Sequence, residues 1–105
     1  MSYAQTAARA AAVIERKGRA ITLRTTNSMT GAQTNRDAYA VLEKVVRHTF
    51  GDSGVQVGDS QYLFRAEDAP AIGERLVDVG LVIRHVEPIQ PGDTVVAWYA
   101  WARAG

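Results

Sequence analysis

The segment TVVAWYAWAR, residues 94–103, limits what this chain can fold into more than any other part of the sequence. Its β-branched and aromatic residues favour a β-strand. Because successive side chains of a strand point to opposite faces, Trp98 lies on one face while Tyr99 and Trp101 lie on the other. One face can be buried in the core of the protein. The second face needs a cover of its own, from the same chain or from a partner.

Length and composition predict a single soluble domain over residues 1–105. A chain of this size buries about two-thirds of the surface of its unfolded form, which is enough for one core. Hydrophobic residues make up 47% and charged residues 22%, and no apolar run approaches the roughly 20 residues that span a bilayer. The N-terminus shows no secretory pattern, so we expect synthesis in the cytoplasm.

Residues 2–17 are predicted to form an α-helix. Ser2 and Gln5 have the spacing of a capping box, an alanine-rich run follows, and Gly18 is a typical residue just past a helix end. The apolar positions form one narrow stripe, which consists of Tyr3, Ala7, Ala10 and Ile14. A stripe of mostly alanine can approach another surface closely but buries little area by itself.

The chain from about residue 19 to residue 103 has mainly β patterns. RAITLRT and QYLFRA alternate as strands do, and ERLVDVG and LVIRHVEP, joined through Gly80, predict a hairpin. In QPGD, Pro91 and Gly92 fit the two central positions of a type II turn directly before the aromatic strand. Two polar segments, residues 26–37 and 48–59, are predicted to be long mobile loops, because they are rich in turn-forming residues and poor in residues to bury.

The segment between these loops fits two structures. The helical reading has an apolar stripe that consists of Ala38, Val41, Leu42, Val45, Val46 and Thr49. A strand is possible only if Glu43 is tolerated on the same face as Tyr39, Val41 and Val45. Periodicity alone favours the helix.

No motif in the sequence predicts an active site, a metal or a cofactor. The absence of cysteine excludes disulfides and thiolate chemistry, and His48 and His85 lie in no metal-binding motif. Most carboxylates neighbour glycine, proline or alanine in predicted turns, where they stabilise loops or keep the surface soluble. The GDSG at residues 51–54 is a good turn, and no serine has the surroundings of a nucleophile. A non-enzymatic β domain is therefore predicted.

The order of these elements resembles the head-closure proteins of tailed bacteriophages, which are also called stopper or head-tail joining proteins. The resemblance extends over residues 15–103 and is clearest in GRAITLR, VQVGDSQYLFRAED, LVIRHVEPIQPGD and the terminal AWAR. It is a pattern of spacing and not a catalytic signature. It implies a mainly β fold, a small β-barrel with an N-terminal α-helix and two long polar loops. Residues 38–49 would then form a strand, with a bulge between Val45 and Val46.

The resemblance also implies a structural function without chemistry. Members of this family form a ring beneath the portal and adaptor of the DNA-filled head, retain the packaged DNA, and offer their other side to the tail. We then expect a homo-oligomeric ring in the virion, assembled in the host cytoplasm. The expected partners are the portal or adaptor protein, a tail protein, and double-stranded DNA contacted sterically, with no membrane and no cofactor.

Two other functions stay open. The first is a tail-completion protein of the same connector. The second is a small barrel that stacks single-stranded nucleic acid on exposed aromatic and arginine side chains, since ten of the twelve basic residues are arginine. The net charge of +1, from twelve basic and eleven acidic residues, argues against that binding module.

Within a ring, the second aromatic face would be a contact between subunits. The alternative is that the chain's own helix or a tightly curled barrel covers it. We expect the face of Trp101 to be the core side. The interface candidates are Tyr3, Ala7, Ala10, Ile14, Trp98, Tyr99 and Trp101. The candidates for a channel gate are Phe50, Gly51, Asp52, Ser53 and Gly54, and those for the second mobile loop are Asn27, Ser28, Met29, Thr30 and Gly31.

Overall fold

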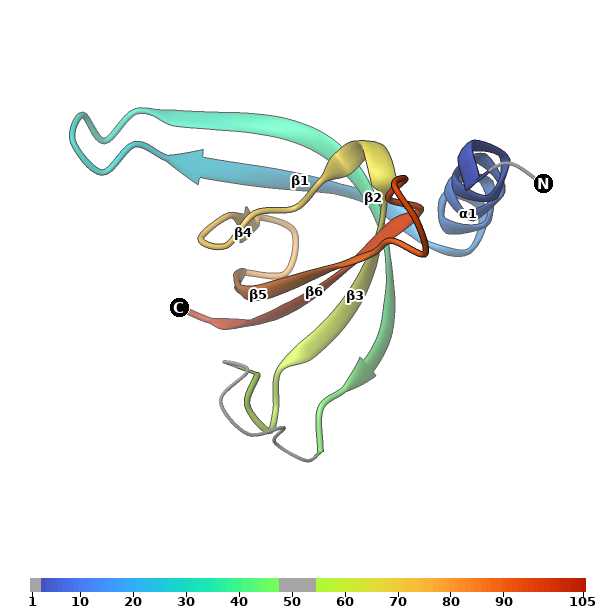
Figure 1. The fold of residues 1–105 in the computed structure, drawn as a ribbon. Coiled ribbons are helices and arrows are strands. Elements are labelled where there is room, and N and C mark those ends of the chain that lie inside the picture. The colour runs from blue at the N-terminus through green and yellow to red at the C-terminus, as the bar shows by residue number, and fades with distance from the viewer. Residues whose placement is uncertain (1–2, 48–54) are drawn as a thin grey trace.

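The fold is a closed antiparallel β-barrel with a helix on its outside, which confirms the predicted fold class (Figure 1). The computed structural model describes residues 3–47 and 55–105. The elements in chain order are α1 (Tyr3–Lys17), β1 (Arg19–Thr26), β2 (Gln33–Val45), β3 (Ser60–Arg65), the 3-10 turn η1 (Ala66–Asp68), β4 (Arg75–Leu76), β5 (Leu81–Ile89) and β6 (Ala97–Ala104). Around the barrel the strand order is β1-β2-β3-β6-β5-β4.

Large and small side chains alternate between neighbouring strands to fill the barrel. β3 lies between β2 and β6, and its inward residues Tyr62 and Phe64 are opposite Ala100 and Ala40 in the two ladders. The alanines leave room for the two rings, which lie 6.4 Å apart between centroids. The complete core cluster consists of Ile21, Leu23, Ala38, Ala40, Tyr62, Phe64, Leu76, Ile83, Ala100 and Ala102.

The helix α1 covers one outer side of the barrel, where it contacts β1, β2, β3 and β6. Ile14 is its one buried residue. Gly18 follows the helix as predicted, and its amide donates to the carbonyl of Ile14 at 2.8 Å. In the described residues, no helix has both the length and the apolar character that crossing a membrane requires.

The strand in residues 38–49 is confirmed as far as Val45, but the position predicted for its bulge is wrong. The register with β3 shifts between Leu42 and Lys44, so that Glu43 is the extra residue. This insertion interrupts the two-residue period of the strand, and the interrupted pattern resembles a helical one in the sequence. Residues 48 and 49 lie outside the described residues.

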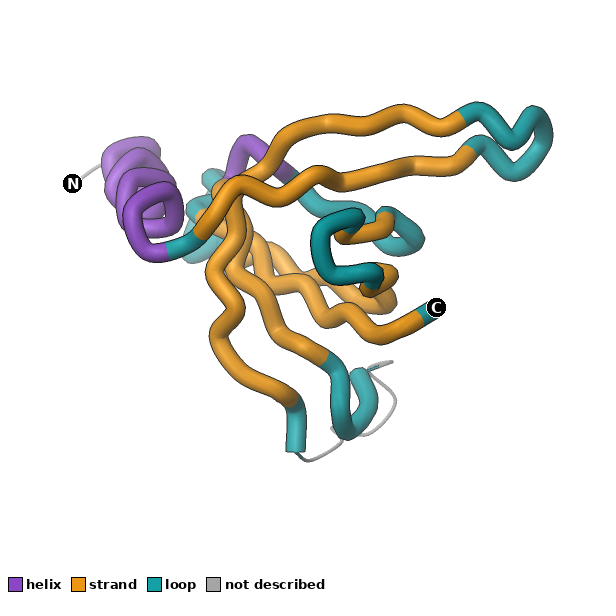
Figure 2. The backbone as a smooth tube through the Cα atoms, turned by 180° about the vertical axis from the view of Figure 1, so that it is seen from behind, coloured by secondary structure: helices purple, strands orange, loops and turns teal. Residues whose placement is uncertain are grey.

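The predicted long loop at residues 26–37 is largely wrong. β1 and β2 pair continuously from Arg19 opposite Ala40 to Thr26 opposite Gln33, so that only residues 27–32 connect them. We call residues 25–37 the hairpin arm, which projects away from the barrel in both views (Figures 1 and 2). Its strands carry no hydrophobic alternation, because solvent lies on both of its faces.

The hairpin of β4 and β5 is confirmed, and Gly80 takes the left-handed conformation at its turn, with φ 70°. The turn predicted at Pro91 and Gly92 is wrong, because Gly92 lacks the positive φ that a type II turn needs. β6 also begins three residues later than residue 94, at Ala97. A Cβ on Gly92 would lie 2.8 Å from Cε2 of the exposed Tyr3, so the segment before β6 lies close to the start of α1.

Candidate functional site

The two aromatic faces of β6 have different surroundings, as predicted. Ala100 and Ala102 point into the barrel, and Trp98 packs against the same core. Trp98 also donates from Nε1 to the carbonyl of Ala66 at 3.2 Å. Trp101 lies in a second cluster outside the barrel. The expectation that the face of Trp101 is the core side holds only in part: Trp101 is buried in a hydrophobic cluster, but the barrel interior belongs to the face of Trp98.

Trp101 is nevertheless only 9% exposed, because the chain itself covers it. Val46 and Val55 pack on its ring, and Tyr99 packs against this cluster from its edge. The indole Nε1 donates to Oε1 of Gln61 at 2.9 Å. The second face of the aromatic strand is therefore covered largely from within the chain.

The interface candidates on α1 divide between covered and open positions. Ile14 is buried against the barrel, and Ala7 and Ala10 are half-buried. Tyr3 is 46% exposed and is the most open aromatic side chain in the described part of the chain. The contact of α1 with the barrel thus uses most of its stripe, and the role of these residues in a contact between subunits stays a prediction.

The candidates for the second mobile loop form the tip of the hairpin arm, which is an ordered turn. Asn27 Oδ1 accepts hydrogen bonds from the amides of Met29 at 2.8 Å and Thr30 at 3.2 Å. Gly31 has φ 74° and donates to the carbonyl of Asn27. Met29 stands at this tip with 94% of its surface exposed. The arm therefore presents one large apolar side chain at the end of a polar ribbon.

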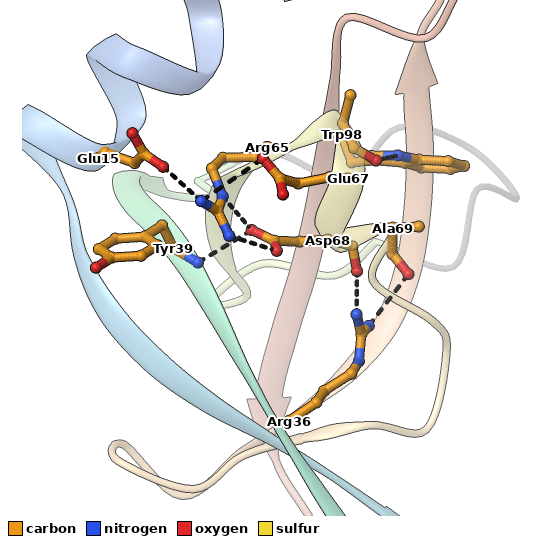
Figure 3. A network of polar contacts seen from close by, with 9 residues as sticks. Glu15, Arg36, Tyr39, Arg65, Glu67, Asp68, Ala69 and Trp98 are labelled. Carbon is orange, nitrogen blue, oxygen red and sulfur yellow. Dashed lines mark hydrogen bonds and ion pairs between the residues drawn. The ribbon is translucent and has the colours of Figure 1, made fainter. Parts of the chain in front are cut away.

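Arg36 fixes the base of the hairpin arm to the barrel (Figure 3). Its guanidinium bonds both carboxylate oxygens of the buried Glu74, at 3.0 and 2.7 Å. It also donates to the carbonyl oxygens of Asp68 and Ala69. The hydrogen bond to Glu74 is the main reason that the pKa of Arg36 is raised. The guanidinium of Arg36 therefore stays charged at all ordinary pH values, and its hydrogen bonds fix the orientation of the arm relative to the barrel.

A second arginine joins the helix to the same region. Arg65 makes two hydrogen bonds of 2.9 Å to the carboxylate of Asp68, and these raise its pKa. It bonds Glu15 of α1 as well, and its guanidinium lies 4.7 Å from the ring centroid of Tyr39 (Figure 3). Asp68 in turn accepts the backbone N–H of Tyr39 at 3.0 Å. Helix, arm and barrel therefore share one polar network.

The outer backbone edge of β2 is free along the hairpin arm. The N–H of Tyr39 points away from β1, because it donates to Asp68. In an antiparallel pair every second residue points the same way, so the N–H and C=O groups of Asp37, Asn35 and Gln33 face outward too. The ladder of β2 with β3 begins only at Ala40. These three residues are a short open edge on which another strand can pair.

The outer edge of β5 is protected by its sequence. Beyond Ile83 this strand pairs with β6 alone, and it contains Pro88 opposite Trp98. Proline has no N–H, which makes this edge a poor template for a further strand. Of the two edges, only the one on the arm suits pairing.

Of the carboxylates predicted to stabilise turns, Asp59 and Glu74 each accept a backbone N–H from three residues earlier, and Asp52 lies outside the described residues. Three of the predicted carboxylates are buried. These three are Asp59, Asp68 and Glu74. Asp59 accepts the amide of Gln56 at 2.8 Å and lies 3.7 Å from Nη1 of Arg103. Sequence reasoning missed the burial of Glu74, because its partner Arg36 arrives from the distant strand β2. Within the part of the chain that the structure describes, no group of three metal-binding side chains occurs.

A hollow of about 500 Å³ opens at one mouth of the barrel. Lys17 and Arg19 lie at the junction of α1 with β1, Leu42 lies on β2, and Val79 lies in the turn before β5. Tyr62 also lines the hollow and reaches it from the core. No motif in the sequence indicated this hollow, because its lining comes from four separate segments.

The proposed channel gate, Phe50 to Gly54, lies outside the described residues. Comparison of the chain with protein-family models, with curated proteins and with solved structures finds no match.

Proposed function

We propose that this protein is a structural subunit of the neck of a tailed bacteriophage, where it closes the DNA-filled head below the portal and provides a docking surface for the tail. The order of elements in the sequence, which resembles that of head-closure proteins, supports this function. The hairpin arm is the observation that carries it, because an ordered ribbon that leaves the barrel and covers nothing of its own is typical of assembling subunits.

The physical argument concerns what the arm lacks. A two-stranded ribbon is marginally stable in water unless further strands or a helix pack against it. Beyond Arg36 the arm has no core, yet its base is fixed by the ion pair of Arg36 with the buried Glu74 and its tip by a hydrogen-bonded turn. A partner that packs on the free edge of residues 33–37 would supply the burial that this ribbon lacks.

The chemistry of the arm favours a protein as this partner. Residues 25–35 contain no charged side chain, so they do not neutralise phosphates. Met29 offers an adaptable apolar contact, which suits a protein surface. DNA in the channel would then be retained sterically. The single-stranded nucleic-acid module is less suited, because Trp101 is covered and cannot serve as a stacking platform.

The test is removal of the gene from the phage that encodes it, with complementation from a plasmid. We expect filled heads without tails, which lose their DNA on storage, and full rescue by the wild-type gene. Electron microscopy and a nuclease-protection assay measure both effects. Normal tailed particles from the deletion strain would exclude this function, and filled heads joined to defective tails would favour the tail-completion role.

A second arm of the test addresses the hairpin arm. Replacing residues 26–33 by Asn-Gly gives the shortened ribbon a two-residue turn and leaves the barrel intact. The shortened protein should fold and fail to complement. The variant Ile72→Ser is the matched control, because Ile72 is also an exposed aliphatic residue but lies outside the arm. Full complementation by the shortened protein would remove the arm from assembly.

A further inference from the structure

The hollow at the barrel mouth is lined by a core tyrosine, Tyr62. Tyr62 is only 4% exposed, and its ring packs beside Phe64 in the core. Both tryptophans of β6 direct their N–H groups to protein acceptors. No hydrogen bond joins the hydroxyl of Tyr62 to a protein group within the described residues, and the residue lines the hollow. A hydroxyl in this position is suited to a ligand.

The charge around this hydroxyl has one sign. Lys17 and Arg19 line the hollow, neither is in an ion pair within residues 3–47 and 55–105, and no carboxylate is in the lining. Burial raises the pKa of Tyr62, and the positive charge of Arg19 partly opposes that shift. The hydroxyl therefore keeps its proton at neutral pH and can donate a hydrogen bond to an anion. Both cations line the hollow, and Arg19 is close enough to Tyr62 for its charge to act on the pKa of that hydroxyl.

The remaining lining is apolar. Ala40 and Val41 form part of the wall, and the side chains of Leu42 and Val79 stay partly open to solvent at its edge. The volume, about 500 Å³, is in the usual range for pockets that hold small ligands. An anion with a short aliphatic portion matches both parts of this lining.

We propose that the hollow binds an aliphatic carboxylate. The carboxylate lies between Arg19 and the hydroxyl of Tyr62, and the hydrocarbon chain lies against Leu42 and Val79. Two sources share this chemistry: a free short-chain carboxylate, and the C-terminal aliphatic residue of a polypeptide. The site does not depend on the role proposed for the protein in the phage neck.

The experiment is a titration of the isotope-labelled protein followed by NMR. The probes are hexanoate and N-acetyl-leucine, each compared with its uncharged amide. We expect saturable shifts at Arg19, Ala40, Leu42 and Val79 with the two carboxylates and far weaker binding of the amides. Tighter binding of N-acetyl-leucine would identify a polypeptide C-terminus as the source, and tighter binding of hexanoate would identify a free acid.

Variants separate the site from nonspecific effects. Tyr62→Phe and Arg19→Gln should each weaken binding by about tenfold or more, because each removes a hydrogen bond or charge directed at the carboxylate. Arg24→Gln, at a half-buried arginine of β1 outside the lining, should leave the affinity unchanged. Arg19 is a surface residue, so its variant remains informative if Tyr62→Phe does not fold. Absence of localised shifts at about 10 mM probe, or unchanged affinity in Arg19→Gln, would overturn the proposal.

Discussion

At the scale of single residues, small side chains determine how closely the backbone segments approach. Gly18 was expected from the sequence as a helix stop, but its φ is not in the left-handed region. The close approach of β2 explains it instead, because a Cβ there would lie 2.3 Å from the carbonyl oxygen of Ala40. Sequence can place such a glycine at a helix end. It cannot show the strand that packs on it.

Gly18→Ala should therefore destabilise the protein by about 2–4 kcal/mol, since backbone atoms of two elements must move apart. Urea denaturation measures the loss. Gly31→Ala is the control, because the space around Gly31 is open and only its positive φ is strained, at a cost of about 1 kcal/mol. Equal losses in the two variants would contradict the packing explanation.

Tyr62 makes the stability depend on alkaline pH. Its pKa in the folded protein is raised above the ordinary value of 10.0 by burial, so the folded state holds this proton more tightly than the unfolded chain does. The contribution of Tyr62 to the free energy of unfolding is complete below about pH 10 and is lost as the pH rises further.

Replacement of Tyr62 by Phe should therefore make the decline in unfolding free energy above about pH 10 less steep. Urea denaturation at several pH values between about 8 and 11 measures this slope. Tyr3→Phe, at an exposed tyrosine, is the control and should keep the slope of the wild type. An unchanged slope in Tyr62→Phe would show that the folded and unfolded states bind this proton equally.

At the scale of elements, strands with one buried face were predictable and strands without one were not. β3 and the hairpin of β4 and β5 alternate in the ordinary way, and so does the barrel part of β1. The arm has two solvated faces, so its sequence looks like a loop. β2 contains the bulge at Glu43, so its sequence looks like a helix. The ion pair of Arg36 with Glu74 could not be predicted from the sequence either, because the two residues meet only through tertiary contact.

The base of the arm depends on this contact. Arg36→Met should lower the unfolding free energy by about 2–3 kcal/mol, because it leaves the buried carboxylate of Glu74 without its cation. Arg36 is itself partly exposed, and for this reason the loss stays below the upper range for buried pairs. Hydrogen exchange should also become faster along residues 25–37.

The double variant Arg36→Met with Glu74→Leu tests the cause of that loss. Removal of both charges should recover much of the stability, because no carboxylate is then buried alone. Denaturation and hydrogen exchange together separate the two effects. A double variant that is less stable than Arg36→Met would show that packing, and not charge, fixes the arm.

At the scale of the whole molecule, the chain covers most of its own aromatic surface. Sequence reasoning recognised that the second face of β6 needs a cover. It could not tell an internal cover from a partner, because Val46 and Val55 are distant in sequence from Trp101 and reach it only through the fold. What stays open to partners in the described residues is scattered: the edge and tip of the arm, Tyr3 on α1, and separate aliphatic side chains such as Leu42, Val57 and Ile72.

These open surfaces are too small and too scattered to hold a ring together in dilute solution. We therefore expect a monomer of 11.4 kDa, or a weak oligomer, that assembles in a ring only on its connector. Light scattering over a range of concentrations measures the mass. The version with the shortened arm should have the same oligomeric state in solution and should fail only to assemble on the connector. A tight ring of the isolated protein at all concentrations would contradict this expectation, because it would require a large interface between subunits that these scattered surfaces do not provide.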